Sequence, residues 1–389
     1  MSGELCAVVG VGQTKYTSAR NDVSIAGLCR EAALRALDDA EMTWRDIDAV
    51  VIGKAPDMFE GVMMPELFLI DALGGAYKPM LRVHTAGSVG GSTGIVAASL
   101  VQSGIHERVL TVAFEKQSES NAMWALTVSM PFSVAVIAGA GGYFAPLIRG
   151  YIRRSGAPED TGIRVALKDR QNALKNPYAH LHLKDISIEK VKESPMLWEP
   201  LHFLESCPSS DGAAAMVLVN SAGAARAPRR PAWVIAHAKR TETIQFPGRD
   251  TVKPQAGVEC AKALYKKAGI TNPRQQIDCA ELYVPFSWYE PMWLEGHLLC
   301  EEGEGWKLTD SGATELGGDF PVNMSGGVLS SNPIGASGMI RCLEAASQVR
   351  GTAGDYQVEG ARVALGHAYG GGANYFAMWL VSSEPAPAF

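Results

Sequence analysis

The spacing of apolar residues predicts a strand–helix–strand unit near the start of the chain and a second one after its middle. Residues 6–12 (CAVVGVG) and 46–53 (DIDAVVIG) are short apolar runs with the length of buried strands. Between them, residues 24–42 carry apolar side chains at intervals of three and four, which predicts an amphipathic helix. The same order returns as the run 232–238, the helical segment 254–270 and the run 276–284.

The repeat continues beyond these units. A Gly- and Ser-rich loop leads into a helix at residues 82–104, and a similar loop and helix occupy residues 324–351. Further apolar runs follow in each copy, at 108–116 and 212–220, then at 361–369 and 372–381. Strands linked by helices form sheets with helices on their faces, so the pattern predicts an α/β protein of two duplicated halves with parallel strands. We assign the halves to residues 1–225 and 226–389.

One segment, residues 117–200, has no counterpart in the second half. It interrupts the first half before its last predicted strand and is rich in Met, Trp, Gly and Pro. A long insertion in a compact domain is commonly a lid or a binding loop. An arm that packs between two subunits is the alternative, and the pattern favours neither.

Composition and charge narrow the class of protein. The chain has 389 residues, of which 47% are hydrophobic and 20% charged, as is typical of a globular protein with a large core. A net charge of −6 gives no overall positive field for nucleic acid. The apolar stretch 131–149 is interrupted by Gly and Pro, so we expect no membrane span. With no export signal recognised, we expect a cytoplasmic protein.

The seven cysteines are scattered along the chain and form no CxxC pair. Their odd number and spacing argue against a disulfide framework and against a zinc site, so we expect reduced thiols and no metal. Cys207 lies in the turn CPSSDG, and the sequence offers no base beside it that would activate the thiol.

Several motifs, taken with the duplicated halves, resemble the thiolase superfamily. They are NPYAHLHLKDISIEKVKESPMLWEPL (176–201), CPSSDGAAAMVLVN (207–220), NMSGGVLSSNPIGASG (323–338) and GHAYGGGAN (366–374). The likeness is to the sterol-carrier-protein-X and lipid-transfer-protein branch, and it covers nearly the whole chain. It implies the thiolase fold, in which two α/β halves form five layers in the order αβαβα.

The same resemblance implies partners and a substrate class. Thiolase-fold chains form homodimers. Members of this branch that cleave steroid side chains form a heterotetramer with a small accessory protein that has an OB-fold and a zinc ribbon. CoA enters as part of the substrate, and no separate cofactor is implied.

The residues that carry thiolase chemistry are replaced in this chain. The resemblance aligns the nucleophilic Cys of a thiolase with Gly87, next to Ser88, and aligns two thiolase histidines with Tyr283 and Asn332. Thiolysis and Claisen condensation pass the acyl group through a thioester on a cysteine, which Gly87 does not provide. Ser88 would need an adjacent base, and both histidines are absent.

A retro-aldol cleavage needs no nucleophile. A base removes the β-hydroxyl proton, the Cα–Cβ bond breaks, and an acid protonates the resulting enolate. Stabilising the enolate oxygen is the demanding step, and it requires hydrogen-bond donors aimed at that oxygen. We assign this role to the Asn332 amide and to backbone N–H groups of two substrate-binding loops, Gly87–Ser88 and Gly370–Gly371.

Tyr283 and Tyr369 are the expected acid and base, because the resemblance extends to steroid side-chain aldolases that use tyrosines in place of the thiolase residues. Which of the two is the acid stays open. A phenol titrates near pH 10 and His near neutrality, so His367, two residues before Tyr369, is expected to tune it.

These residues predict an aldol-lyase that cleaves a β-hydroxyacyl-CoA with a steroid side chain into a ketone or aldehyde and a shorter acyl-CoA. Two alternatives are a degenerate thiolase or acyltransferase that uses Ser88, and a non-catalytic scaffold protein that binds a CoA ligand. The aromatic stretch YVPFSWYEPMW (283–293) has two interpretations, packing at a dimer or domain boundary and a wall of a pocket for a polycyclic substrate.

Overall fold

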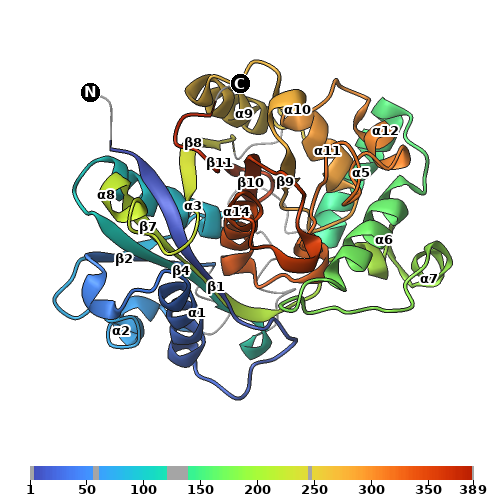
Figure 1. Cartoon of the computed structure of the whole chain (residues 1–389). Coiled ribbons are helices and arrows are strands. Elements are labelled where there is room, and N and C mark those ends of the chain that lie inside the picture. Colours follow the sequence, from blue (N-terminus) through green and yellow to red (C-terminus); the bar gives the residue numbers. More distant parts are fainter. Residues whose placement is uncertain (1–3, 56–60, 121–138, 244–247, 388–389) are drawn as a thin grey trace.

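A nine-stranded mixed sheet runs through the whole protein in the order β3-β2-β4-β7-β1-β8-β11-β10-β9 (Figure 1). The computed structural model describes residues 4–55, 61–120, 139–243 and 248–387. The strands of the first half are β1 (Cys6–Gln13), β2 (Ala49–Lys54), β3 (Met80–Val83), β4 (Arg108–Lys116) and β7 (Asp211–Asn220). Those of the second half are β8 (Ala232–Thr241), β9 (Cys279–Glu281), β10 (Val363–Gly370) and β11 (Tyr375–Ser382).

The strand order agrees with the predicted duplication. Counted from the centre of the sheet outward, β1, β7, β4 and β2 correspond to β8, β11, β10 and β9. Val322 makes a parallel bridge to Ala280 of β9, so it stands where β3 stands in the first half. The halves meet where β1 pairs with β8, through Ala7 with Trp233 and Val8 with Ala232.

The prediction of parallel strands is wrong for β7 and β11. β2 runs parallel to β3 and β4, and β9 runs parallel to β10. In contrast, β7 is antiparallel to β1 and β4, and β11 is antiparallel to β8 and β10. Residues 371–374 alone link β10 to β11, which is too short for a crossover and therefore forces a hairpin.

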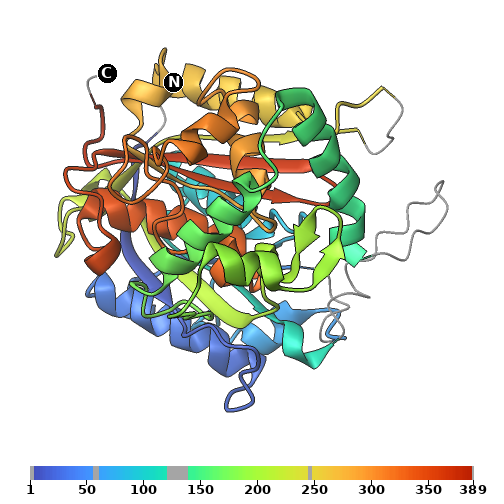
Figure 2. The same ribbon diagram turned by 90° about the vertical axis from the view of Figure 1, so that its right-hand side faces the viewer.

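Helices cover both halves of the sheet and fill the space between them, which gives the five layers of the thiolase fold (Figure 2). α1 packs on the outer face of the first half, α9 packs on the outer face of the second, and α3 and α14 lie together between them. The helices outside the insertion are α1 (Ile25–Asp39), α2 (Pro65–Leu69), α3 (Val89–Gln102), α8 (Ser221–Ala224), α9 (Gln255–Ala268), α10 (Pro273–Gln276), α11 (Tyr289–Gly296), α12 (Gly305–Asp310), α13 (Gly327–Ser330) and α14 (Ile334–Arg350).

The two central helices touch through glycines. A Cβ atom on Gly90 of α3 would lie 2.4 Å from the backbone nitrogen of Met339 on α14. A Cβ atom on Gly338 of α14 would lie 2.8 Å from the nitrogen of Gly91. No real side chain fits at such distances, so glycine is what lets the N-terminal ends of both helices meet at the centre of the molecule.

The described part of the insertion packs against helices of the second half. It contains α5 (Gly139–Ser155), α6 (Thr161–Ala173), α7 (Ile188–Glu193) and the hairpin of β5 (Met196–Trp198) and β6 (Leu201–His202). Polar side chains of α6 are buried, namely Lys168, Asp169, Arg170 and Asn172. α6 packs against α12 and α13, so this part of the insertion is joined to the second half, and the choice between a lid and an arm between subunits stays a prediction.

The apolar stretch 131–149 lies partly outside the described residues. Its remainder, from Gly139, opens α5, which carries Arg149, Arg153 and Arg154 in its later turns. Among the described residues, no helix is long and apolar enough to cross a bilayer.

Candidate active site

Two helix N-termini and two strand ends bring the predicted residues together. Gly87 and Ser88 precede α3, Asn332 precedes α14, Tyr283 follows β9, and Tyr369 lies near the end of β10. A Cβ atom on Gly87 would lie 3.2 Å from the carbonyl oxygen of Tyr369 and 3.9 Å from the hydroxyl oxygen of Tyr283. Residues from both halves, up to 282 positions apart, therefore form one site.

The Gly370 backbone closes this site from the side of the β10–β11 hairpin. A Cβ atom on Gly370 would lie 2.4 Å from the Ser88 nitrogen and 2.5 Å from the Gly87 nitrogen. Only glycine allows the hairpin to approach the start of α3 so closely. These distances place the two predicted substrate-binding loops in contact. Gly371 follows in the turn with a φ of +66°.

The Asn332 side chain makes hydrogen bonds to three other side chains of the site. Its Oδ1 accepts hydrogen bonds from the Tyr283 hydroxyl (3.3 Å) and from the Ser337 hydroxyl (2.8 Å). Its Nδ2 donates to the Cys207 sulfur at 3.1 Å. The Asn332 backbone is held as well, because its N–H donates to Ser210 Oγ at 3.1 Å. The amide therefore has a defined orientation beside Tyr283.

Tyr283 and Tyr369 pack edge to face, with ring centroids 5.2 Å apart and planes at 86°. Both side chains are 4% exposed. The Tyr369 hydroxyl has no hydrogen-bond partner among the described residues, although its ring is packed by Tyr289 and Trp293. Burial raises the pKa of both phenols, so both are neutral at physiological pH and carry their protons.

The aromatic side chains of residues 283–293 are buried next to the site. Tyr283, Phe286, Trp288, Tyr289 and Trp293 are all buried within a single protomer, which excludes packing at a dimer boundary. The Trp293 indole N–H donates to the Tyr283 carbonyl at 2.8 Å. The stretch thus packs behind Tyr283 and Tyr369 and holds Tyr283 in position.

His367 lies behind Tyr283. It is fully buried, and its Nδ1 accepts the Tyr283 backbone N–H at 3.4 Å. Its ring is stacked on that of Tyr369, with centroids 6.4 Å apart, and makes no hydrogen bond to it. Burial and the neighbouring His297 ring lower the pKa of His367 well below its ordinary value, so the imidazole is neutral. The geometry favours support of the Tyr283 backbone over tuning of Tyr369.

Among the residues that the structure describes, Ser88 makes no hydrogen bond to a base that would activate it as a nucleophile. Its hydroxyl is buried and donates within its own loop, to the Thr85 carbonyl at 2.8 Å and to Thr85 Oγ1 at 3.0 Å. A serine becomes nucleophilic when a base accepts its proton, and here a neutral carbonyl accepts it. Ser88 thus acts as a loop residue at the start of α3.

Sequence reasoning set Cys207 aside and missed two further residues of this site, Ser337 and Arg170. Ser337 lies one helical turn after Asn332, a spacing that could have indicated the contact. Cys207 is 125 positions from Asn332 and is half-buried, with burial raising the pKa of its thiol to about 11. Arg170 is buried and donates to the carbonyls of Leu204 (3.2 Å) and Ser206 (2.9 Å), which positions the loop that carries Cys207.

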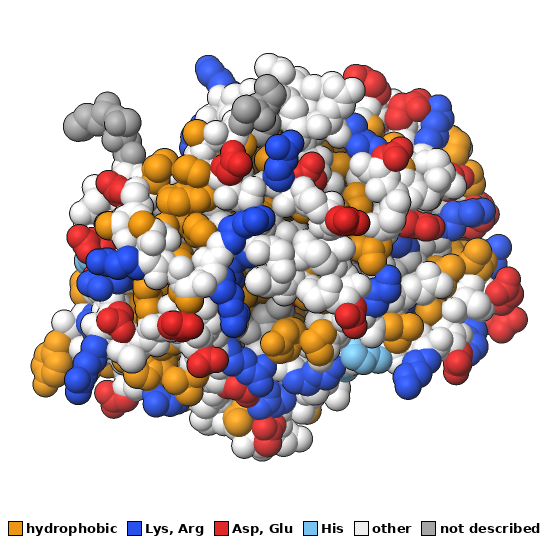
Figure 3. All heavy atoms as spheres, viewed as in Figure 1, with side chains coloured by type: hydrophobic (Ala, Val, Ile, Leu, Met, Phe, Trp, Pro, Cys, Tyr) orange, Lys and Arg blue, Asp and Glu red, His pale blue; other side chains and the backbone are white. Residues whose placement is uncertain are grey.

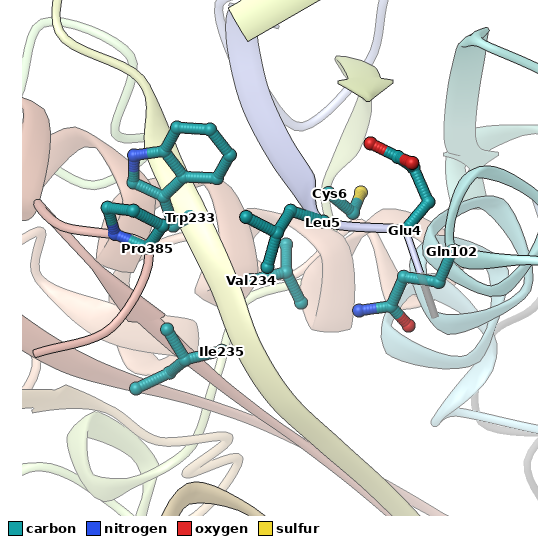
Figure 4. A pocket seen from close by; sticks show the side chains of 8 residues that line it. All are labelled: Glu4, Leu5, Cys6, Gln102, Trp233, Val234, Ile235 and Pro385. Atoms are coloured by element: carbon teal, nitrogen blue, oxygen red, sulfur yellow. The ribbon is translucent and has the colours of Figure 1, made fainter. Parts of the chain in front are cut away.

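Among the described residues, neither the possible metal ligands nor the surface pockets add a second functional site. No group of three or more His, Cys, Asp or Glu side chains there could hold a metal ion. A pocket of about 290 Å³ lies at the seam between β1 and β8 (Figure 4). None of the candidate active-site residues lines this pocket. It is lined by Glu4, Leu5, Cys6, Gln102, Trp233, Val234, Ile235 and Pro385.

Comparison with known proteins agrees with this architecture. Residues 238–382 match a family model described as thiolase C-terminal domain-like. Acetyl-CoA acetyltransferase of Methanothermobacter thermautotrophicus is 31% identical over 385 residues, covering 94% of this chain and 96% of the relative. Human sterol carrier protein 2 is 30% identical over 388 residues, covering 94% and 70%. The solved Ltp2–ChsH2(DUF35) aldolase has a TM-score of 0.84 at 27% identity and covers 98% of both chains.

The chain therefore belongs to the thiolase superfamily of acyl-CoA enzymes. Within the superfamily it falls in the sterol-carrier-protein-2 and lipid-transfer-protein branch, as its motifs implied. The nucleophilic cysteine expected from the thiolase alignment is absent at Gly87, so the reaction has to be derived from the residues that stand around it.

Proposed function

We propose that this protein is an aldol-lyase that cleaves a β-hydroxyacyl-CoA into a ketone or aldehyde and a shorter acyl-CoA. The proposed acyl group is a steroid side chain, carried over from the resemblance to the steroid-cleaving aldolases of this branch. Similarity to the Ltp2–ChsH2(DUF35) aldolase supports the reaction class.

One observation carries the proposal. Where a thiolase has its nucleophile, this chain has Gly87, and a side chain there would lie 3.9 Å from the Tyr283 hydroxyl. That phenol is hydrogen-bonded to the Asn332 amide, and the Tyr369 ring packs edge to face against it. The site thus keeps proton donors and an amide, while Gly87 provides no group that could form an acyl-enzyme at the position of the thiolase nucleophile. The nearby Cys207 thiol is held protonated, because burial raises its pKa to about 11.

The chemistry follows from two neutral phenols. Both hydroxyls carry their protons, so a phenol oxygen accepts the β-hydroxyl proton only as that phenol gives up its own. The proton given up ends on Cα, directly or through the second phenol, so no net proton is gained or lost. The Cα–Cβ bond breaks, its electrons form the enolate, and Cβ becomes the new carbonyl carbon. The Asn332 Nδ2 and the backbone N–H groups near Gly87 and Gly370 are the donors available to the enolate oxygen.

The proposed homodimer uses the exposed edge of the first half. β3 ends the sheet, and several apolar side chains near it are exposed, namely Met63 (70%), Met64 (56%), Leu67 (60%), Phe68 (68%) and Leu81 (42%). Figure 3 shows apolar side chains gathered over the region of α2. An apolar group beside an open sheet edge is typical of a surface that a second protomer covers.

An accessory protein with an OB-fold and a zinc ribbon is the proposed further partner, in a heterotetramer. The resemblance suggests it, and the similar solved aldolase couples Ltp2 with ChsH2(DUF35). The function assay is therefore run with and without such a partner.

The test of function is direct product analysis. The purified protein is mixed with a β-hydroxy steroid side-chain CoA thioester, and the products are followed by mass spectrometry. A steroid ketone or aldehyde together with a short acyl-CoA, both lost in Tyr283→Phe, would support the proposal. Thiolysis of a 3-oxoacyl-CoA without any aldol cleavage, with the partner present, would overturn it.

A further inference from the structure

The turn between β10 and β11, residues 371–374, lies against the start of α3. A Cβ atom on Gly370, the last residue of β10, would lie 2.5 Å from the Gly87 nitrogen and 2.4 Å from the Ser88 nitrogen. Ala373 in the same turn has a φ of +57°, in the left-handed region, where a residue with a side chain stays only if its surroundings hold it there. The groups that hold this turn therefore also decide where Gly370 lies.

Arg249 binds the turn through two of its carbonyls. Its Nη2 donates to the Gly372 carbonyl at 2.5 Å and to the Ala373 carbonyl at 2.6 Å. Because the C=O and N–H of a trans peptide point in opposite directions, the N–H of Asn374, which shares a peptide unit with the Ala373 carbonyl, points away from Arg249. That N–H donates to the Gly370 carbonyl at 3.0 Å. A continuous set of hydrogen bonds thus runs from Arg249 through the turn to Gly370.

Two residues of α5 act on the same turn, Tyr143 directly and Arg154 through the loop that carries Arg249. The Tyr143 hydroxyl donates to the Gly372 carbonyl at 3.5 Å. Arg154 makes two hydrogen bonds, of 2.7 Å and 3.1 Å, to the carboxylate of Asp250, the residue after Arg249. Both members of that ion pair are exposed, so the pair orients the loop more than it stabilises the fold. The insertion is thereby connected to the turn beside the active site.

We infer that Arg249 is a positioning residue of the active site, which keeps Gly370 fixed beside Gly87 through its hydrogen bonds to the turn. The inference deepens the proposed function and rests on it in assigning the backbone N–H groups around Gly370 to the enolate oxygen. Donors that are fixed in advance stabilise the enolate more than the bound thioester, so loss of Arg249 should lower kcat and leave KM nearly unchanged.

Amide hydrogen exchange tests the hold on the turn without any substrate. Arg249→Ala removes both bonds to the turn, so we expect the Asn374 N–H, followed by mass spectrometry in a peptide that covers the turn, to exchange about tenfold faster. Guanidinium added at millimolar concentration should slow this exchange again by taking the place of the lost side chain. Arg240→Ala is the matched control, because Arg240 is exposed on β8 and donates to the carbonyl of its neighbour Lys239. Wild-type protection of the Asn374 N–H in Arg249→Ala would overturn the inference.

Exchange of α-protons tests the positioning role. Enolisation of bound propionyl-CoA in D₂O replaces its Cα protons with deuterium, and it uses the enolate donors without any aldol cleavage. We expect Arg249→Ala to lower the kcat of this exchange about 10- to 100-fold with little change in KM. Arg249→Lys should restore part of the rate, because one nitrogen of Arg249 makes both bonds and an ammonium group carries three donors. A loss that neither Arg249→Lys nor guanidinium restores would show a general structural role and overturn the inference, as would an unchanged kcat.

Failure of the inference and failure of the aldolase proposal are distinguishable. A protein that exchanges α-protons more slowly as Arg249→Ala, but cleaves no β-hydroxyacyl-CoA, keeps the positioning role and loses the aldolase proposal. A protein whose Arg249→Ala variant cleaves substrate and exchanges α-protons at the wild-type rate keeps the aldolase proposal and loses the role of Arg249. A wild-type protein that neither exchanges α-protons nor cleaves a β-hydroxyacyl-CoA removes both proposals.

Discussion

Replacing Tyr283 by phenylalanine separates the chemical role of its hydroxyl from its packing role. The substitution removes one oxygen atom and keeps the ring that packs edge to face on Tyr369. Asn332 Oδ1 loses the 3.3 Å bond from Tyr283 but keeps the 2.8 Å bond from Ser337. No buried acceptor is left without a donor, so the change is small for the fold and large for proton transfer.

The two effects differ enough in size to be measured apart. Loss of one long hydrogen bond whose acceptor stays satisfied costs about 1 kcal/mol of unfolding free energy or less. For a chain of 389 residues, this corresponds to a fall in melting temperature of about 1 °C. Loss of an acid or base lowers the rate about 10²- to 10⁴-fold, or about 3 to 5 kcal/mol of transition-state stabilisation.

The assay combines three measurements on Tyr283→Phe and wild type. Mass spectrometry gives the rate of aldol cleavage, calorimetry gives the affinity for propionyl-CoA, and thermal unfolding gives the melting temperature. We expect a cleavage rate at least 100-fold lower, with affinity and melting temperature nearly unchanged. A rate within tenfold of wild type would refute a proton-transfer role for Tyr283. A melting temperature lowered by more than 5 °C would refute the packing argument.

Three further predictions follow from other parts of the structure. Ser88→Ala should keep cleavage within about threefold, because the Ser88 hydroxyl bonds within its own loop. Burial, followed by repulsion from Glu281, raises the pKa of Glu344 from 4.5 to about 7. Its contribution to stability is therefore complete below pH 4.5 and is lost as pH rises through 7, so Glu344→Gln should reduce the fall in melting temperature between pH 5 and 8. Phe68→Glu should convert the proposed dimer to a monomer in light scattering, whereas Leu34→Glu, on an exposed site of α1, should not.

Each of these has a clear contrary result. A loss of cleavage above 100-fold in Ser88→Ala would restore this serine as a candidate nucleophile. An unaltered pH dependence in Glu344→Gln would mean that other buried carboxyl groups govern it. A wild-type protein that is monomeric at micromolar concentration would remove the dimer itself.

The sequence pattern predicted the duplicated halves because periodicity and order repeat along the chain, as in the helix pair α1 and α9 and the loop–helix pair before α3 and α14. Strand direction was missed because an apolar run such as 212–220 looks the same in either direction. For β11, the four residues between the runs of β10 and β11 did contain the signal, since only a hairpin closes so short a gap.

The candidate site was predictable where its residues lie at element ends. Gly87, Tyr283, Asn332 and Tyr369 all stand at the junction of a loop with a helix or strand, and the structure brings them together. The role of Cys207 was not predictable, because its partner Asn332 is 125 positions away in the sequence. Contacts of this kind depend on how loops stack in three dimensions.

The glycine contact between α3 and α14 has a consequence for how the two halves depend on each other. Each central helix completes the packing of the other, and at Gly90 and Gly338 the fit leaves no room for even one carbon atom. A chain cut near residue 225 would leave each fragment with an uncovered central helix, and each would lack half of the residues around Gly87. The repeat is visible in the sequence, but because the two central helices complete each other's packing, we expect the whole chain to unfold as one unit.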